Sequence, residues 1–349
     1  MEALPPTLLL LAGNAGAEAP LTNATSILYA AGGLLLLALG GELLVRGASA
    51  AALRLRLTPA VVGLTIISLG TSLPELVVSV TAQLKGSEDL AFANVVGSNL
   101  FNIGMVLGLC ALLRPLQIPG STVRLELPFL IVASFIALFL ARDSHLSESS
   151  MIDRWEGLFL LISLAFFSAY MVRLARREVT REQSHNLDVA VHALTGAAAE
   201  KHPILVPLAK VGAGSLCLWL GGEALVEGSR SLALHLGITE RVIGLTVVAA
   251  GTGCPELVAT LVALRHGKTD MAIGNVIGSN IFNLLGILGC AALVRPLHVS
   301  ARLLSWDLWW MLGVTLLLLP LLQGRRLSRV EGAILFVAYA AYATTLFTR

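Results

Sequence analysis

Ten stretches of about 20 mostly apolar residues follow one another along this chain, and no other feature limits its fold as strongly. A helix of about that length crosses the hydrocarbon core of a bilayer. Soluble domains carry about a quarter charged residues, whereas 13% of this chain of 349 residues is charged and 56% is hydrophobic. The sequence therefore predicts an all-α, polytopic membrane protein of ten transmembrane helices, with the spans 27–46, 58–83, 89–113, 125–141, 156–174, 204–228, 240–264, 270–294, 303–322 and 328–347.

Only one connection between these spans is long. Residues 175–203 are polar and rich in charge, so we expect them to form an aqueous loop. Residues 1–26 hold no Lys or Arg, whereas a cleaved signal peptide begins with positive charge, so we interpret them as an exported N-terminal extension. The predicted organisation is this extension, a first five-helix repeat over 27–174, the loop, and a second five-helix repeat over 204–349.

The basic residues predict the orientation of the chain in its membrane. With the N-terminus outside, 16 of the 24 Lys and Arg residues fall on the inner side and 8 on the outer side. Membrane proteins carry the excess of positive charge in their inner loops. We therefore expect a multi-pass membrane protein with both termini outside and the 175–203 loop in the cytoplasm. The net charge of +2 is too small to predict nucleic acid as a partner.

The two halves of the chain repeat each other without a gap. The stretch GLTIISLGTSLPELV at 63–77 recurs as GLTVVAAGTGCPELV at 244–258, and NVVGSNLFN at 94–102 recurs as NVIGSNIFN at 275–283. Each pair is offset by 181 residues, and five predicted spans separate each residue from its partner. Because five is odd, the second copy crosses the membrane in the opposite direction. Such inverted repeats are typical of secondary transporters, whose halves meet around a site near the middle of the bilayer.

One glutamate lies in the middle of the second span and another in the middle of the seventh. These residues, Glu75 and Glu256, occupy equivalent positions in the two repeats. A carboxylate inside the hydrocarbon core costs several kcal/mol unless it faces a cavity or a partner. A protonated, hydrogen-bonded pair is the structural alternative. Two carboxylates also supply the charge and the hard oxygen atoms that calcium prefers, so the pair predicts a divalent-cation site.

Each glutamate follows a predicted break in its helix. Pro74 has no amide hydrogen to donate to the carbonyl of Gly70, and Pro255 has the same relation to Gly251. Carbonyl groups freed at membrane depth are tolerated where they line a cavity or meet an ion. We therefore include the two glycine carbonyls among the candidate ion ligands. One turn before each glutamate, on the same face of the helix, stand Thr71 and Thr252.

Polar residues of the third and eighth spans form a second predicted wall of the site. Asn94, Ser98 and Asn102 are spaced four residues apart and share one face of a helix. The same pattern recurs as Asn275, Ser279 and Asn283. Neutral oxygen atoms beside two carboxylates complete a coordination shell without adding charge. Such residues also hold helices together in membranes, and the sequence leaves both interpretations open.

Together these motifs resemble the two alpha repeats of the calcium:cation antiporter superfamily. The matching residues are GTSLPE at 70–75 and GSNLFN at 97–102, with their inverted copies. Within the superfamily, the chain is similar to bacterial sodium/calcium exchangers. The resemblance implies a ten-helix fold, exchange of calcium for sodium by alternating access, and ion sites built from the second, third, seventh and eighth spans. It implies that Glu75 and Glu256 hold calcium, and that calcium or sodium is also bound by Thr71, Ser72, Ser98, Asn102, Thr252, Ser279 and Asn283.

The second repeat departs from this pattern at two positions. Gly253 stands where the first repeat has Ser72, so one hydroxyl ligand expected for sodium is missing. We expect a water molecule to fill this gap, since buried waters bridge polar groups where there is room. On that reasoning, Gly253→Ser tightens the sodium activation of exchange. The second departure is Asn283, which stands where related exchangers often carry an acidic residue.

The same features leave other functions to consider. Proton-coupled calcium export is one, because a buried glutamate pair can exchange protons, although that branch typically carries a Gly-Asn-Ala-type sequence before the glutamate. A cation channel is another. An intramembrane metal hydrolase would need a motif such as HExxH, which the sequence lacks. We expect a transporter and not an enzyme, without a cofactor, with calcium, sodium and the bilayer as partners. A monomer is sufficient for this function, although the sequence does not give the oligomeric state.

Overall fold

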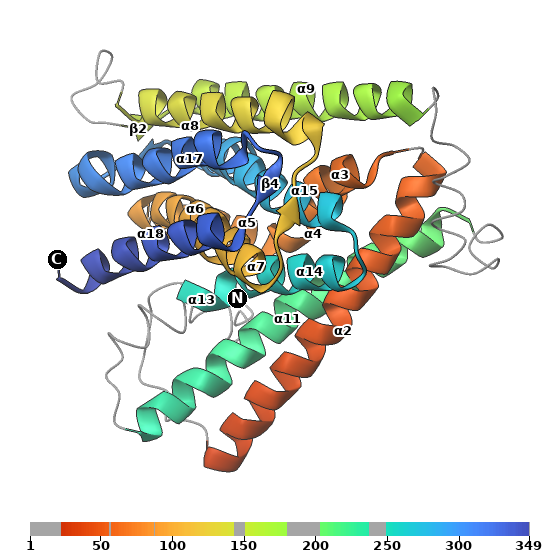
Figure 1. The fold of residues 1–349 in the computed structure, drawn as a ribbon. Coiled ribbons are helices and arrows are strands. Elements are labelled where there is room, and N and C mark those ends of the chain that lie inside the picture. The colour runs from red at the N-terminus through yellow and green to blue at the C-terminus, as the bar shows by residue number, and fades with distance from the viewer. Residues whose placement is uncertain are drawn as a thin grey trace.

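The computed structural model describes residues 22–55, 57–86, 88–142, 151–179, 203–236 and 249–348. Their main chain is helical over nearly its whole length (Figure 1). The helices of the first half are α2 (Asn23–Leu55), α3 (Pro59–Val62), α4 (Ser68–Thr71), α5 (Leu73–Leu84), α6 (Glu88–Leu100), α7 (Gly108–Leu113), α8 (Leu127–Arg142) and α9 (Arg154–Val179). Those of the second half are α11 (Leu205–His235), α13 (Ala249–Thr252), α14 (Cys254–Arg265), α15 (Thr269–Ile281), α16 (Leu288–Val294), α17 (Leu308–Leu322) and α18 (Arg329–Thr348).

Wider π-helical turns interrupt several of these helices. In the first half they are η1 (Gly63–Ile67), η2 (Phe101–Leu107) and η3 (Thr122–Glu126). In the second half they are η6 (Phe282–Ile287) and η7 (Leu303–Asp307). η2 and η6 begin at equivalent positions of the two halves, and η3 and η7 cover the same positions under the 181-residue offset. π-helical turns occur frequently at functional sites, and both halves therefore carry the same local distortions.

Seven of the described helices are long and apolar enough to cross a membrane, and the bent segment from α3 to α5 raises this number to eight. The seven are Asn23–Leu55, Leu90–Leu113, Thr122–Arg142, Arg154–Arg176, Leu205–His235, Thr269–Val294 and Leu303–Leu322. Part of the predicted seventh span, 240–248, and most of the predicted aqueous loop, 180–202, lie outside the described residues.

Some predicted helix ends need correction, whereas the mostly helical class is confirmed. α2 runs to Leu55, although the sequence predicts an end at Arg46, and α11 runs to His235 instead of ending at 228. Neighbouring helices bury part of these extra turns, so hydropathy alone underestimates the length of both helices. The structure also contains short strands, which are β1 (Leu116–Gln117), β2 (Met151–Ile152), β3 (Leu297–His298) and β4 (Arg326–Leu327).

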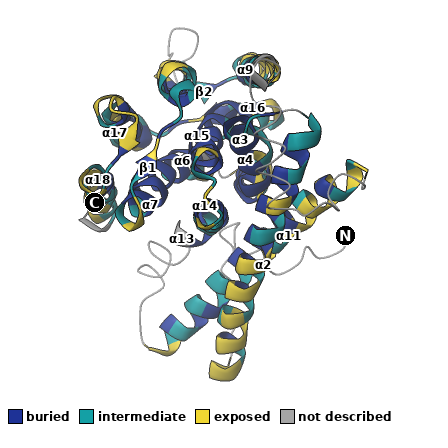
Figure 2. Ribbon diagram, turned by 45° about the vertical axis from the view of Figure 1, so that its right-hand side comes forward, coloured by how far each residue is buried: buried dark blue, intermediate teal, exposed yellow. Residues whose placement is uncertain are grey.

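α2 and α11 lie side by side along most of their length and project from the rest of the bundle (Figures 1 and 2). Glycines at every seventh position of both helices form the contact. A Cβ at Gly33 would lie 2.5 Å from the amide nitrogen of Leu225, so only glycine permits this approach. The same close approach occurs at Gly40 and Gly47 of α2 and at Gly214, Gly221 and Gly228 of α11.

The two halves exchange contacts in matching ways. β1 pairs with β4, and β3, which stands at the equivalent position of the second half, pairs with β2. Likewise, α7 contacts α18, and its equivalent α16 contacts α9. In each half, the end of the third predicted span therefore packs against the last helix of the other half.

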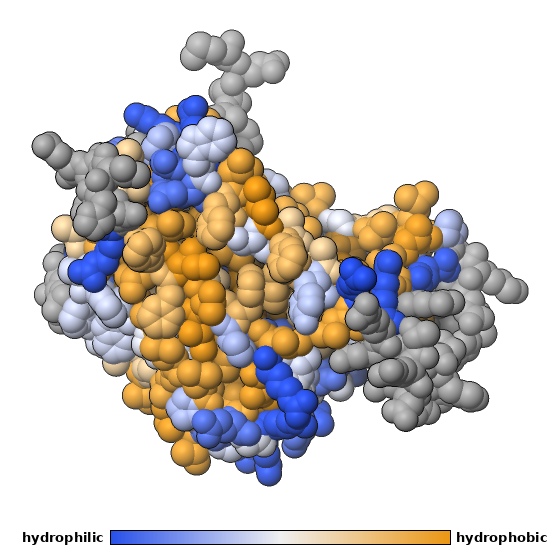
Figure 3. Space-filling view, turned by 90° about the horizontal axis from the view of Figure 1, so that it is seen from above, coloured by the Kyte–Doolittle hydropathy of each residue, from blue (hydrophilic) through white to orange (hydrophobic). Residues whose placement is uncertain are grey.

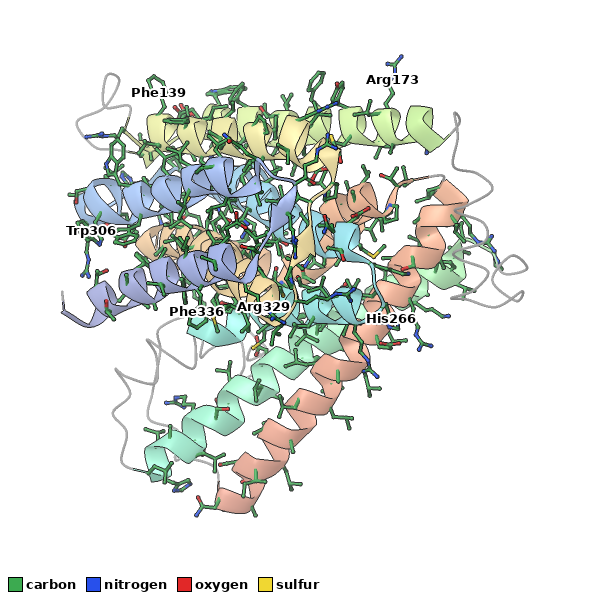
Figure 4. All side chains as sticks on the ribbon, viewed as in Figure 1. Phe139, Arg173, His266, Trp306, Arg329 and Phe336 are labelled. Atoms are coloured by element: carbon green, nitrogen blue, oxygen red, sulfur yellow. The ribbon has the colours of Figure 1, made fainter. Side chains whose placement is uncertain are left out.

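α6 and α15 form the centre of the bundle, and α9, α17 and α18 form part of its rim (Figure 2). Apolar side chains cover much of the face around α8 and α9 (Figure 3). Phe139 of α8 is 67% exposed and points away from the bundle (Figure 4). An exposed apolar surface of this extent is typical of a face that binds a membrane or a partner.

Candidate ion-binding site

The second predicted span is broken at Ser72. This residue leaves the helical conformation with φ −89° and ψ 8°, and the axis bends by 47° between the segment ending at Thr71 and the segment beginning at Leu73. Gly253 has nearly the same conformation in the second half, with φ −87° and ψ −2°. Proline is the second residue of the helix that follows each break, where its missing amide hydrogen is tolerated. The breaks thus lie two residues after the predicted glycines.

Gly70 and Gly251 allow α11 to approach the two broken segments. A Cβ at Gly70 would lie 2.5 Å from the hydroxyl of Ser215, and one at Gly251 would lie 1.9 Å from a methyl group of Val226. The absence of a Cβ at both glycines lets these side chains of α11 pack directly against the broken segments. The prediction that their carbonyl groups bind ions remains a prediction.

Glu75 and Glu256 stand in the first turn of α5 and of α14, directly after the breaks. Each side chain is 1% exposed, and the two are close enough for their charges to interact. Ser72 donates a hydrogen bond of 2.9 Å to Oε1 of Glu256, which joins the two halves. The Oε2 atoms of both glutamates have no hydrogen-bond partner among the described residues.

Amide groups of η2 and η6 add further unpaired oxygens. Asn102 and Asn283 are each 1% exposed. Neither amide atom of Asn102 has a hydrogen-bond partner within the described part of the chain, and the same holds for Oδ1 of Asn283. Buried polar groups are almost always hydrogen-bonded. Unpaired carboxylate and amide oxygens of this kind suit a hard cation such as calcium or sodium.

Asn94 and Asn275 connect helices. Asn94 donates to the carbonyl oxygen of Glu75 at 3.2 Å and to the hydroxyl of Ser79 at 2.9 Å. Asn275 donates to the hydroxyl of Thr260, the equivalent of Ser79, at 3.1 Å. Ser79 and Thr260 were not among the predicted site residues, although the 181-residue offset relates them. The interhelical interpretation is therefore supported for both asparagines.

Threonine and serine hydroxyls connect the first broken span to α15. Thr71 is buried, and its Oγ1 lies 3.3 Å from Oδ1 of Asn275 and 3.4 Å from Oγ of Ser279. Ser98 is also buried, and Thr252 is half-buried. The structure thus places Thr71 and Ser279 in direct contact. Their roles as ion ligands, like those of Ser72, Ser98 and Thr252, stay predictions.

The predicted water-filled gap at Gly253 is wrong. A Cβ at this residue would lie 2.3 Å from two carbon atoms of the Phe101 ring. The ring therefore occupies the space in which the missing side chain would lie. Phe101 is in turn held by an edge-on contact with Tyr339 of α18. The sequence expectation failed because it considered Gly253 only against its own repeat partner, whereas the neighbour comes from the other half.

A second pair of buried acids escaped the sequence analysis. Glu126 and Asp307 are related by the same 181-residue offset and are 0% and 5% exposed. Thr122 donates to Glu126 at 2.7 Å, and Tyr342 donates to Asp307 at 3.0 Å. The repeat register was the signal that could have found them, but the acids differ in type and stand at span ends.

Glu42 links α2 to the turn after α14. Its carboxylate lies 3.0 Å from Nε2 of His266 and 2.5 Å from Nε of Arg46. Lys268, in the same turn, donates to the hydroxyl of Ser49. Burial lowers the pKa of Lys268 to about 8, and the charge of Glu42 partly opposes this shift.

Comparison with known proteins places these features in a family. The family described as "Sodium/calcium exchanger protein" matches residues 25–173 and 207–348. The chain is 32% identical over 344 residues to the sodium/calcium exchanger MaX1 of Methanosarcina acetivorans, covering 90% of this chain and 96% of that protein. It is 34% identical over 292 residues to the inner membrane protein YrbG of Escherichia coli, covering 82% of this chain and 85% of that protein.

A solved structure shows the same fold. The sodium-calcium exchanger NCX_Mj, in crystals soaked with sodium and without calcium, superimposes with a TM-score of 0.77. The two chains are 26% identical, and the match covers 93% of this chain and all of the other.

Proposed function

Because this chain belongs to the sodium/calcium exchanger family, we propose that it exchanges calcium for sodium across its membrane by alternating access. Membership confirms the resemblance drawn from the paired motifs, and it makes the chain a multi-pass membrane transporter of cations and not an enzyme. The observation that carries the proposal is the buried pair Glu75 and Glu256, each with one oxygen that no described residue satisfies.

The chemistry of the pair explains why a divalent ion suits it. Two ionised carboxylates buried close together are unfavourable, since each loses its hydration and both repel each other. One calcium ion neutralises both charges and supplies the missing partners of their oxygens. Sodium carries half that charge, so sodium ions would have to occupy the site in greater number to offset the same two carboxylates. Competition between the two ions for shared ligands is what an exchanger requires.

The proposed site combines the carboxylates with neutral groups around them. Glu75 and Glu256 hold calcium, and the unpaired amide oxygens of Asn102 and Asn283 complete its shell. The hydroxyls and carbonyls that share calcium or sodium with them are those of Thr71, Ser72, Ser98, Thr252, Ser279, Gly70 and Gly251. The Ser72 hydroxyl supports this arrangement, because its hydrogen bond to Glu256 brings a group of the first half onto the carboxylate of the second.

The proposed architecture is ten spans in two inverted five-helix repeats, over 27–174 and 204–349. The matched contacts of the two halves support it, because β1–β4 and β3–β2 exchange strands in the same way. We place the chain in the bacterial inner membrane, as the name of YrbG suggests for that relative. The 16-to-8 distribution of basic residues supports both termini outside, with the 175–203 loop in the cytoplasm.

Calcium flux into proteoliposomes tests the function. The purified chain is reconstituted, and uptake of calcium-45 is measured with an imposed gradient of sodium, protons or potassium in turn. We expect uptake to follow the sodium gradient. Uptake driven only by a proton gradient would assign coupling to protons, and uptake that ignores every other ion would indicate a channel.

Variants of the acid pair test the site. We expect Glu75→Gln and Glu256→Gln each to abolish sodium-dependent calcium uptake, because each removes one of the two charges that balance calcium. Glu227→Gln is a matched control, since Glu227 lies on α11 within 3.9 Å of Arg230 and outside the site. Near-normal uptake by either site variant would refute the paired-carboxylate site.

A further inference from the structure

Three buried side chains connect α17 to the site through the centre of the bundle. Met311 of α17, Asn99 of α6 and Asn283 of η6 are each 1% exposed. Nδ2 of Asn99 lies 3.6 Å from the sulfur of Met311. Oδ1 of Asn99 accepts a hydrogen bond of 3.1 Å from Nδ2 of Asn283.

The thioether of Met311 determines how the amide groups of Asn99 and Asn283 are oriented in this relay of hydrogen bonds. Sulfur in methionine accepts hydrogen bonds weakly and cannot donate one. The NH₂ group of Asn99 therefore faces Met311, and its oxygen faces Asn283. Asn283 must in turn direct its own NH₂ group toward Asn99. Its remaining atom, Oδ1, is the buried oxygen that finds no partner in the described part of the chain.

The equivalent groups of the other half do not form this relay. Leu130 stands where the second half has Met311, and a leucine accepts no hydrogen bond. Asn280, the equivalent of Asn99, instead donates to the carbonyl of Val276 in its own helix at 2.7 Å. Asn102, the equivalent of Asn283, is accordingly left with both amide atoms unpaired among the described residues. The described part of the first half thus lacks both the sulfur acceptor and the hydrogen bond between the two asparagines.

We propose that Asn99 is a positioning residue, which together with Met311 holds the amide of Asn283 so that its oxygen is presented to the transported ion. This inference rests on the proposed site. It gives the two amide ligands different properties, because Asn283 is oriented in advance and Asn102 is free to turn. The relay also favours a neutral amide at 283, since a carboxylate there would place an oxygen against the oxygen of Asn99. The charge of the site is then set by the two glutamates alone.

The test compares three variants in proteoliposomes. Asn99→Ala removes the acceptor of Asn283. Met311→Leu removes the sulfur with little change of volume, which cores tolerate well. Thr315→Val is the control, because Thr315 is equally buried one turn further along α17 and its hydroxyl donates to the carbonyl of Met311. Calcium-45 exchange is measured as a function of calcium and of sodium concentration for each variant.

We expect Asn99→Ala to raise the half-saturating concentration of calcium, of sodium, or of both, by about twofold to tenfold, which is the effect of one lost hydrogen bond. The maximal rate should stay within about twofold of wild type. Met311→Leu should shift the same half-saturating concentration in the same direction by a smaller factor, and Thr315→Val should leave it unchanged.

Two results would overturn the positioning role. One is a wild-type half-saturating concentration for both ions in Asn99→Ala and Met311→Leu. The other is a loss of maximal rate without any change in half-saturation, because such a loss indicates damaged packing. A wild-type protein without sodium-dependent calcium flux would instead refute the proposed function, so the two failures are distinguishable.

Discussion

The glycine contact between α2 and α11 leads to a prediction with built-in controls. Gly32 and Gly33 are neighbours in the same helix, yet a Cβ at Gly32 would meet no described atom within 4 Å, whereas one at Gly33 would lie 2.5 Å from the nitrogen of Leu225. α11 offers the same comparison. There, Gly212 is open, and a Cβ at Gly214 would lie 2.5 Å from the nitrogen of Leu44. The perturbation is alanine at each of the four glycines.

The magnitude follows from the overlap. A distance of 2.5 Å is 0.9 Å inside the 3.4 Å at which ordinary contact begins, and the obstructing atoms belong to the main chain. The two helices must therefore move apart, and overpacking of this kind costs about 1–3 kcal/mol. Alanine also improves helix propensity by up to about 1 kcal/mol relative to glycine, but the controls carry the same gain. With a shift in Tm of about 2–4 °C for each kcal/mol, Gly33→Ala and Gly214→Ala should melt about 2–12 °C below their controls.

The assay is thermal unfolding of the detergent-solubilised protein, followed by size-exclusion chromatography after heating. Gly32→Ala and Gly212→Ala should melt at or above the temperature of wild type. The reasoning would be refuted if Gly33→Ala and Gly214→Ala were as stable as these two controls. That result would mean that α2 and α11 can move apart without a loss of stability, and that the seven-residue glycine spacing has no structural role.

Gly253→Ser should weaken calcium exchange instead of tightening its sodium activation, and Phe101→Leu in the same chain should restore part of it; tighter sodium activation in the single variant would contradict the position of the ring. In intact cells, the new cysteine of Ala190→Cys should not react with membrane-impermeant thiol reagents, whereas that of Ala19→Cys should react. The reverse pattern would overturn the orientation with both termini outside. Because the pKa of Lys268 falls from near 10.5 to about 8 on folding, its unfavourable contribution should disappear between those pH values. The Tm of wild type should therefore rise relative to that of Lys268→Met as pH increases through this window, and parallel curves would refute it.

Local chemistry in the sequence was enough to locate the two broken helices and the acids beside them. Pro74 and Pro255 each remove one helical hydrogen bond wherever the surrounding chain lies. The breaks accordingly occur two residues before each proline, at Ser72 and Gly253. Glu75 lies in the middle of an apolar predicted span, and this position was enough to predict that its side chain is buried.

The partners of these residues were decided by the tertiary structure. Ser72 bonds to Glu256, 184 residues away, and the ring of Phe101 covers Gly253. Whether Asn94 meets an ion or a neighbouring helix was likewise open in the sequence, and the structure places it against α5. Helical period and repeat offset specify which face a residue occupies, but they do not specify how far a neighbouring helix is shifted along its axis. A shift of one turn, about 5.4 Å, exchanges every partner across the contact while it leaves each sequence pattern unchanged.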